Sequence, residues 1–185
     1  MRKLFSFLFA SLDGYHETRE HDIGWHRVDD EFDEFDLAQL GEADTFLLGR
    51  ATYQAFAEFW PTAEAREIEP VRAAIFSSQP KVVVSRTLRD APWENTTIVS
   101  ANVDAAIRTL KERPGLAIEM IGSAKLSAYL IQAGLVDELR VMVNPVLLGT
   151  GMPAFPVTGP VNLELAGTRP FGNGNILLTY RPAPA

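Results

Sequence analysis

Small residues stand beside a basic residue at three points where an apolar run ends. These stretches are LLGRAT, with Gly49, Arg50 and Thr52; VVVSRT, with Ser85 and Arg86; and IGSAKL, with Gly122, Ser123 and Lys125. Each apolar run is typical of a buried strand, so these residues leave the ends of strands. A helix that begins after a strand offers unpaired amides and a partial positive charge, and arginine adds a bidentate fork. The three stretches therefore predict binding of phosphate groups.

Arg50 and Arg86 would follow successive strands of a sheet. Ligands of open α/β sheets bind beyond the carboxyl ends of the strands. Two arginines there suit the ribose phosphate of NADP, whereas NAD binding is marked by a carboxylate that contacts the ribose. The plain alternative is that both arginines are ordinary surface charges, and the residues alone leave this alternative open.

The elements that would position these residues alternate along the chain. Strands are predicted at 3–10, 44–50, 81–86, 96–100 and 116–122, and helices from about 28, at 51–60, at 103–113 and from 124. Three further apolar segments, 138–149, 161–171 and 175–182, follow without a helix between them, so they are predicted to be antiparallel. Residues 60–70 are expected to form a flexible excursion.

This alternation predicts one α/β domain over residues 1–185, with a mostly parallel sheet covered on both faces and antiparallel C-terminal strands. The formal net charge of −7 and the scattering of the 17 Lys and Arg residues argue against a nucleic-acid partner. No apolar run is long enough for a membrane span, so no membrane partner is expected. The absence of cysteine excludes thiolate chemistry and fits a cytoplasmic protein.

Several motifs resemble the dihydrofolate-reductase-like superfamily: FASLDGYH, LLGRATY, IGSAKL and above all LIQAGLVDELRVMVNPVLLGTGMPAF. The most specific resemblance is to the RibD C-terminal domain family, the reductase domain of the bifunctional deaminase-reductase of riboflavin biosynthesis. It implies a three-layer α/β/α, dihydrofolate-reductase-like fold that binds NADPH, and a homodimer. The zinc deaminase domain of the bifunctional enzymes needs cysteine, which this chain lacks, so a stand-alone reductase domain is expected.

The resemblance assigns NADPH contacts to three turns. In the family, a Gly-Arg-x-Thr turn holds cofactor phosphates, a Ser-Arg pair after the next strand faces the adenosine 2′-phosphate, and a Gly-Gly turn before a later helix lies along the pyrophosphate. The residues implied are Gly49, Arg50, Thr52, Ser85, Arg86, Gly122, Ser123, Ala124, Lys125 and Leu126.

The second position of the Gly-Gly turn is a serine in this chain. Because glycine lets a backbone approach a phosphate most closely, Ser123 would shift or weaken cofactor binding. Alternatively, Ser123 caps the helix that follows it.

A hydride delivered to a C=N or C=O group needs an accompanying proton, so a carboxyl with a raised pKa is expected near the nicotinamide. Asp13, in SLDG, matches an Asp-Gly of the riboflavin-type reductases, and Asp30 resembles in spacing the acid that follows a tryptophan in dihydrofolate reductases. The alternatives are a turn-forming aspartate and a solvated first-turn acid, and water or substrate could also supply the proton. Asp13, Trp25 and His26 are predicted to contact the substrate.

His16, His21 and His26 recur every five residues, a spacing that does not align side chains on a helix, so no metal site is predicted. The function predicted is an NADPH-dependent reductase that acts on a small heterocycle or a ribosylamino-pyrimidine, similar to 5-amino-6-(5-phosphoribosylamino)uracil reductase. One alternative is a dihydrofolate or pteridine reductase. Another is a non-catalytic cofactor- or ligand-binding protein of the same fold.

The apolar segment LRVMVNPVLL is expected at an antiparallel edge of the sheet. Because an exposed apolar edge aggregates, it is expected to be covered, and the family resemblance implies that a homodimer partner covers it.

Overall fold

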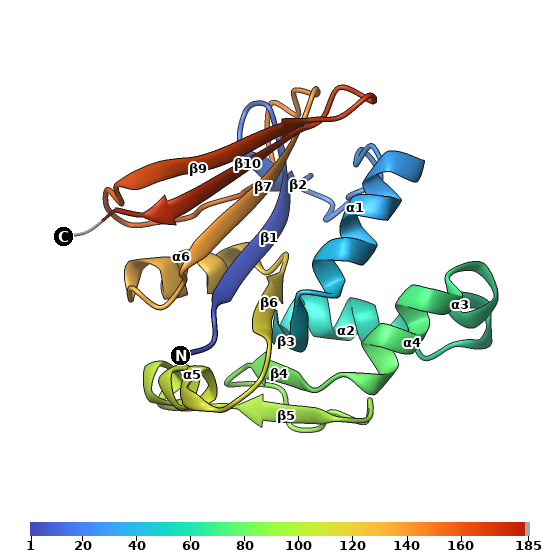
Figure 1. Ribbon diagram of the computed structural model, residues 1–185, viewed down its shortest axis with the longest axis vertical. Coiled ribbons are helices and arrows are strands. Elements are labelled where there is room, and N and C mark those ends of the chain that lie inside the picture. The colour runs from blue at the N-terminus through green and yellow to red at the C-terminus, as the bar shows by residue number, and fades with distance from the viewer. Residues whose placement is uncertain (184–185) are drawn as a thin grey trace.

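The computed structural model describes residues 1–183 and is built on an eight-stranded sheet of order β5-β4-β3-β6-β1-β7-β10-β9 (Figure 1). The pairs from β5 to β7 are parallel, and β10 runs antiparallel to both of its neighbours, which confirms the predicted fold class. The strands are β1 (Leu4–Ser11), β3 (Ala43–Gly49), β4 (Lys81–Val84), β5 (Thr96–Val99), β6 (Ala117–Ile121), β7 (Glu138–Asn144), β9 (Leu163–Pro170) and β10 (Ile176–Pro182).

Helices cover both faces of the parallel part of the sheet. On one face lie α1 (Asp30–Leu40), α2 (Arg50–Phe59) and α4 (Pro70–Ser78), and on the other lie α5 (Val103–Glu112) and α6 (Ala124–Gln132) (Figure 1). Alternate side chains of β3 show why: Phe46 and Leu48 join the core under α1, α2 and α4, whereas Leu47 joins the core under α5 and α6. None of the helices in residues 1–183 is long and apolar enough to cross a bilayer.

The starts of α1 and α2 differ in their capping. Asp29 caps α1, because its side chain accepts a hydrogen bond from the amide of Phe32 at 3.0 Å. By contrast, α2 begins directly after Gly49, and no side chain in residues 1–183 caps its first amides. The N-terminus of α2 therefore presents unpaired donors at the carboxyl edge of the sheet.

Residues 60–70, which were expected to form an irregular excursion, are largely helical. Thr62 caps the short helix α3 (Ala63–Ile68) by accepting from the amide of Ala65 at 3.1 Å, and Pro70 occupies the first position of α4. Proline suits that position because the first amide of a helix has no partner within the helix. Pro70 therefore begins a helix here.

The segment LRVMVNPVLL is not at an edge of the sheet, so that expectation was wrong. It contains most of β7, which pairs with β1 on one side and β10 on the other, and β9 is the exposed edge strand. A separate ladder joins β2 (Tyr15–Glu17) to β8 (Met152–Pro153) and holds the loop after β1 against the connection between β7 and β9.

Candidate functional site

The three stretches predicted to bind phosphate lie side by side. β4, β3 and β6 are neighbours in that order and run parallel, so their carboxyl ends meet at one edge of the sheet. Gly49 pairs with Val84, so Arg50 and the Ser85–Arg86 pair leave the sheet at the same level. Residues 36 positions apart in the chain thus face one ligand-sized region.

Ser123 joins the turn after β6 to the start of α2. Its Oγ accepts the amide of Gly49 at 2.8 Å and lies 2.9 Å from Oγ1 of Thr52. It also donates to the carbonyl of Ile121 at 3.1 Å, which leaves Thr52 as the donor in their mutual bond. Ser123 has φ 55° and ψ 47°, and its side chain makes no capping bond to α6 within residues 1–183. The alternative that Ser123 caps α6 with its side chain was therefore wrong; the hydroxyl fixes the spacing of the two turns.

Gly122 forms an open cradle beside this junction. It has φ +55°, and an added Cβ would lie 3.5 Å from Nε2 of His16 and 3.7 Å from Oγ1 of Thr52. Glycine thus keeps the backbone accessible between these two side chains, as a bound diphosphate requires. The residues present therefore fit a dinucleotide phosphate. His16 was missed as a site residue, because only the β2–β8 ladder brings it here.

Arg50 and Arg86 are exposed, and neither side chain forms a hydrogen bond or ion pair with any residue from 1 to 183. Ser85 is buried, and its Oγ accepts the amides of Thr87 at 3.2 Å and Leu88 at 2.9 Å. Because Ser85 is buried, Arg86 is the exposed group at this strand exit that can reach a phosphate.

The first turn of α6 offers mainly backbone donors. Ala124 is buried and Leu126 packs against the core under α5 and α6, whereas Lys125 is exposed. Of the three predicted contacts in this turn, Lys125 alone could reach a ligand with its side chain, and the other two could contribute only their amides.

A cavity of about 270 Å³ opens on the α1 and α2 face of the sheet. Ile121 lines it and immediately precedes Gly122, so the cavity adjoins the phosphate-binding turns. Its walls combine aromatic and charged side chains. The aromatic residues are Phe7, Phe9, Phe32, Phe56, Trp60 and Phe76, and the charged ones are Asp33, Asp36, Glu69, Arg72 and Glu119.

Trp25 and His26 lie next to Phe9, which lines this cavity, although neither of the two lines it itself. The ring of His26 stacks on Phe9 with centroids 4.0 Å apart, and Trp25 meets His26 edge-on at 4.4 Å. Nε1 of Trp25 and Nε2 of His26 are buried and have no hydrogen-bond partner in residues 1–183. Burial lowers the pKa of His26 to about 4, so its ring is neutral at neutral pH. Two unsatisfied polar atoms beside a cavity point to a polar ligand group.

Asp13 and Asp30 do not line this cavity. The carboxylate of Asp13 is exposed and accepts from Oγ of Ser11 at 2.6 Å and from the amides of Leu148 and Gly149 at 3.1 and 2.7 Å. The bond from Ser11, with those from the two amides, lowers the pKa of Asp13, which makes it a poor proton donor at neutral pH. Asp30 is exposed in the first turn of α1.

Glu119 is a candidate that sequence reasoning missed. It lies in β6 with 1% of its surface exposed, and its Oε1 accepts from Nε2 of Gln39 at 2.9 Å. Oε2 is buried without a hydrogen-bond partner in residues 1–183. Burial, with the charge of Asp36 nearby, raises the pKa of Glu119 to about 8, so the carboxyl is mostly protonated at neutral pH. The available signal was a lone carboxylate in the apolar strand AIEMI.

The chain is similar in sequence and in fold to known proteins. The uncharacterized protein YyaP of Bacillus subtilis (strain 168) is 32% identical over 181 residues, which cover 97% of this chain and 94% of YyaP. A proposed riboflavin biosynthesis protein of Shewanella sp. PV-4 has a similar structure, with a TM-score of 0.76, 21% identity and coverage of 98% and 99% of the two chains.

Two further solved structures share the fold. The deaminase/reductase of Thermotoga maritima, of which this chain spans 57%, gives a TM-score of 0.70 at 15% identity over 98% of this chain. Dihydrofolate reductase from Enterococcus faecalis in complex with NADP(H) gives 0.66 at 15% identity, with coverage of 98% and 97%. The sequence model of the RibD C-terminal domain matches residues 2–177, and the chain belongs to the RibD C-terminal domain family.

Proposed function

We propose that this protein is a cytoplasmic NADPH-dependent reductase that transfers hydride to a small heterocycle or a ribosylamino-pyrimidine. The observation that carries the proposal is the meeting of three strand exits, with Arg50 and Arg86 unpaired, beside an aromatic cavity. The membership of a family named for a riboflavin-pathway reductase domain supports the reaction class.

The order of the strands suits an extended dinucleotide. From β4 to β1 there are three steps of about 4.8 Å each, which places Arg86 at one end and the end of β1 at the other. In this arrangement Arg86 binds the ribose 2′-phosphate, while Arg50, Thr52 and the Gly122 turn hold the diphosphate at the N-terminus of α2. NADPH, when bound, supplies the hydride.

The cavity would hold the hydride acceptor. Its aromatic walls can stack on a planar ring and exclude water, and Ile121 places the ring next to the cofactor turn. We propose that Trp25 and His26, next to Phe9 of the cavity wall, contact the substrate, as predicted from the sequence. For Asp13 we propose a positioning role, because its carboxylate fastens the 148–149 amides to the end of β1.

Replacing Arg86 with alanine should weaken NADPH binding about 10- to 100-fold and leave NADH binding nearly unchanged, because only NADPH carries the 2′-phosphate. Replacing Arg50 should weaken both cofactors by a similar factor. Titration of each cofactor against each variant, followed by cofactor fluorescence, measures the effect. Arg108→Ala, an exposed arginine on α5 at the other face, is the matched control. Unchanged NADPH affinity in Arg50→Ala would remove the central claim.

The alternative of a non-catalytic binding protein is favoured by one observation, since both acids predicted to donate a proton are exposed outside the cavity. It predicts that NADPH binds with a preference over NADH, but that no member of a panel of imines and carbonyls is reduced. Turnover of any member contradicts it.

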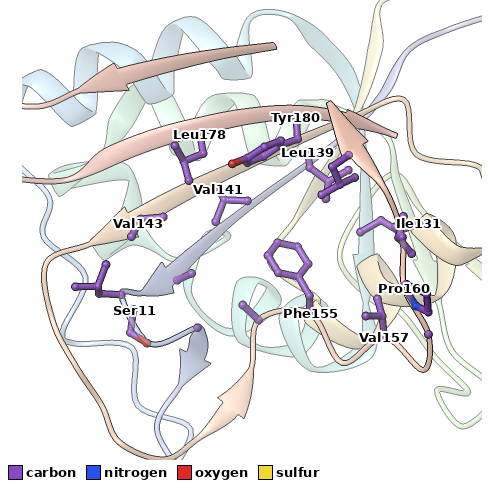
Figure 2. A pocket seen from close by; sticks show the side chains of 17 residues that line it. Ser11, Ile131, Leu139, Val141, Val143, Phe155, Val157, Pro160, Leu178 and Tyr180 are labelled. Atoms are coloured by element: carbon purple, nitrogen blue, oxygen red, sulfur yellow. The ribbon is translucent and has the colours of Figure 1, made fainter. Parts of the chain in front are cut away.

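We also propose a homodimer in which a second copy covers the apolar face of the antiparallel strands. A cavity of about 510 Å³ lies there, with Leu139, Val141 and Tyr180 on the sheet and Phe155 opposite them (Figure 2). Leu163 also lines it and is 39% exposed. Soluble monomers rarely expose an apolar patch of this kind to water, so a covering partner is expected.

Sedimentation at micromolar concentration should show a dimer, and Leu163→Asp should shift it towards monomer. Leu116→Asp, at a leucine before β6 that is 57% exposed, should not. A wild-type protein that sediments only as a monomer contradicts the proposal.

A further inference from the structure

The floor of the aromatic cavity carries one polar atom that the fold leaves unsatisfied. Oε2 of Glu119 is buried and has no hydrogen-bond partner in residues 1–183, although the residue lines the cavity. A buried carboxyl oxygen without a partner costs free energy, so its retention calls for an explanation.

The other oxygen of Glu119 is held by a fixed network. Oε1 accepts from Nε2 of Gln39 at 2.9 Å, and Oε1 of Gln39 accepts from Nη1 of Arg140 at 3.1 Å. Because arginine can only donate, it sets the orientation of the Gln39 amide, and that amide must then donate to Glu119. The network therefore fixes the carboxyl group and leaves Oε2 for another partner.

The other charged groups of the cavity are already paired. Arg72 donates to Asp36 and Asp33 at 2.8 Å each and to Glu69 at 2.7 Å. One guanidinium therefore pairs with three of the four acids that line the cavity. The fourth, Glu119, forms no ion pair with any residue from 1 to 183. A group that binds Oε2 would therefore come from outside residues 1–183.

The walls restrict the shape of that ligand. Aromatic faces and edges line the space and favour a flat ring; they come from Phe7 and Phe9 of β1, Phe32 of α1, Phe56 of α2 and Trp60 directly after α2. A protonated carboxyl can donate to a ring nitrogen or a ring carbonyl, and a carboxylate can accept from a protonated ring nitrogen. Either way, one proton lies between Oε2 and the ring.

We propose that Glu119 is a ligand-binding residue whose Oε2 hydrogen-bonds a ring nitrogen or ring carbonyl of a planar heterocycle held in this cavity. This deepens the proposed function and rests on it in one respect, namely that the heterocycle is the hydride acceptor. The bond would select nitrogen heterocycles over carbocycles of the same shape, since the latter leave Oε2 unpaired.

The test uses two bicyclic probes of the same shape, 4-aminoquinazoline and 1-aminonaphthalene, which differ in their ring nitrogens. Calorimetric titration of the full chain should show about tenfold or greater preference for the quinazoline. Glu119→Met, which keeps the volume, should abolish that preference, and Glu119→Gln should keep part of it because an amide still donates. Glu34→Gln, an exposed acid on α1, should change nothing.

A wild-type protein without the preference overturns the proposal, and so does a Glu119→Met variant that retains it. If Glu119→Met does not fold, the comparison of the two probes on wild type and on Glu119→Gln decides. NADPH titration separates this proposal from the proposed function. Loss of NADPH binding with the quinazoline preference intact contradicts the reductase alone, whereas NADPH binding without the preference contradicts the role of Glu119 alone.

Discussion

An Arg140→Ala variant is expected to lose about 3–5 kcal/mol of unfolding free energy. Arg140 is 8% exposed, and its guanidinium donates to Glu42 at 3.0 and 2.7 Å and to Glu138 at 2.9 Å. It also lies 4.1 Å over the ring of Phe5. Without Arg140, the buried Glu138 (5% exposed) keeps Lys3, at 2.8 Å, as its remaining close partner. The Gln39 side chain also loses the donor that orients its amide. Urea denaturation measures the loss.

Arg181→Ala is the matched control. Arg181 also approaches Glu138, at 3.8 Å, but its side chain is 66% exposed. Exposed ion pairs contribute from about 0 to 1 kcal/mol, so this variant should be nearly as stable as the wild type. Equal losses of unfolding free energy in Arg140→Ala and Arg181→Ala would mean that burial does not determine how much Arg140 contributes to stability.

Most of the sheet could be predicted because its strands are local apolar runs bounded by turn residues. β1, β3 and β4 were expected at 3–10, 44–50 and 81–86, and they lie within two residues of those bounds. The errors are where local pattern carries little information. α3 has only six residues, too few for a helical period to show, and the two strands of the β2–β8 ladder are short and pair across the chain.

The positions of the three turns at strand ends were predictable for the same reason, because a strand end, a small residue and a basic residue are neighbours in sequence; that these turns bind phosphate stays a prediction. Glu119 was not predictable, because its environment is assembled from distant parts of the chain. Gln39, which donates to Glu119, is 80 residues away in the sequence. Arg140 is linked to Glu119 through its hydrogen bond to Gln39. Whether a carboxylate inside an apolar strand is paired with a cation cannot be read from the strand itself.

A Glu119→Gln variant is expected to become more stable than the wild type as pH rises. The pKa of Glu119 is raised from 4.5 to about 8, first because burial disfavours the charged carboxylate and then because Asp36 repels it. Between these two values the folded protein binds more protons than the unfolded chain. The free energy of unfolding therefore falls with rising pH, by up to about 1.4 kcal/mol per pH unit from this group.

The sign of the effect distinguishes Glu119 from Glu138. The pKa of Glu138 is lowered, chiefly by its bonds to Lys3 and Arg140 against the opposing effect of burial, so it loses its stabilising contribution at acidic pH instead. Asp36 also has a raised pKa, chiefly because of burial, and its charge is one of the causes that raise the pKa of Glu119, so the two groups titrate together. The difference between Glu119→Gln and wild type therefore reports on Glu119 together with its coupling to Asp36.

The difference in unfolding free energy between Glu119→Gln and wild type should be constant below about pH 4.5, grow between pH 4.5 and 8, and level off above pH 8. Its total increase over this range should be at most about 5 kcal/mol. Urea denaturation at several pH values measures it, and Glu34→Gln should show no such trend. A flat difference would mean that the carboxylate of Glu119 finds a stabilising partner on deprotonation. A ligand whose N–H group donates a hydrogen bond to Oε2 should reduce the slope of the unfolding free energy against pH in the wild type. Such a bond stabilises the charged carboxylate that burial disfavours.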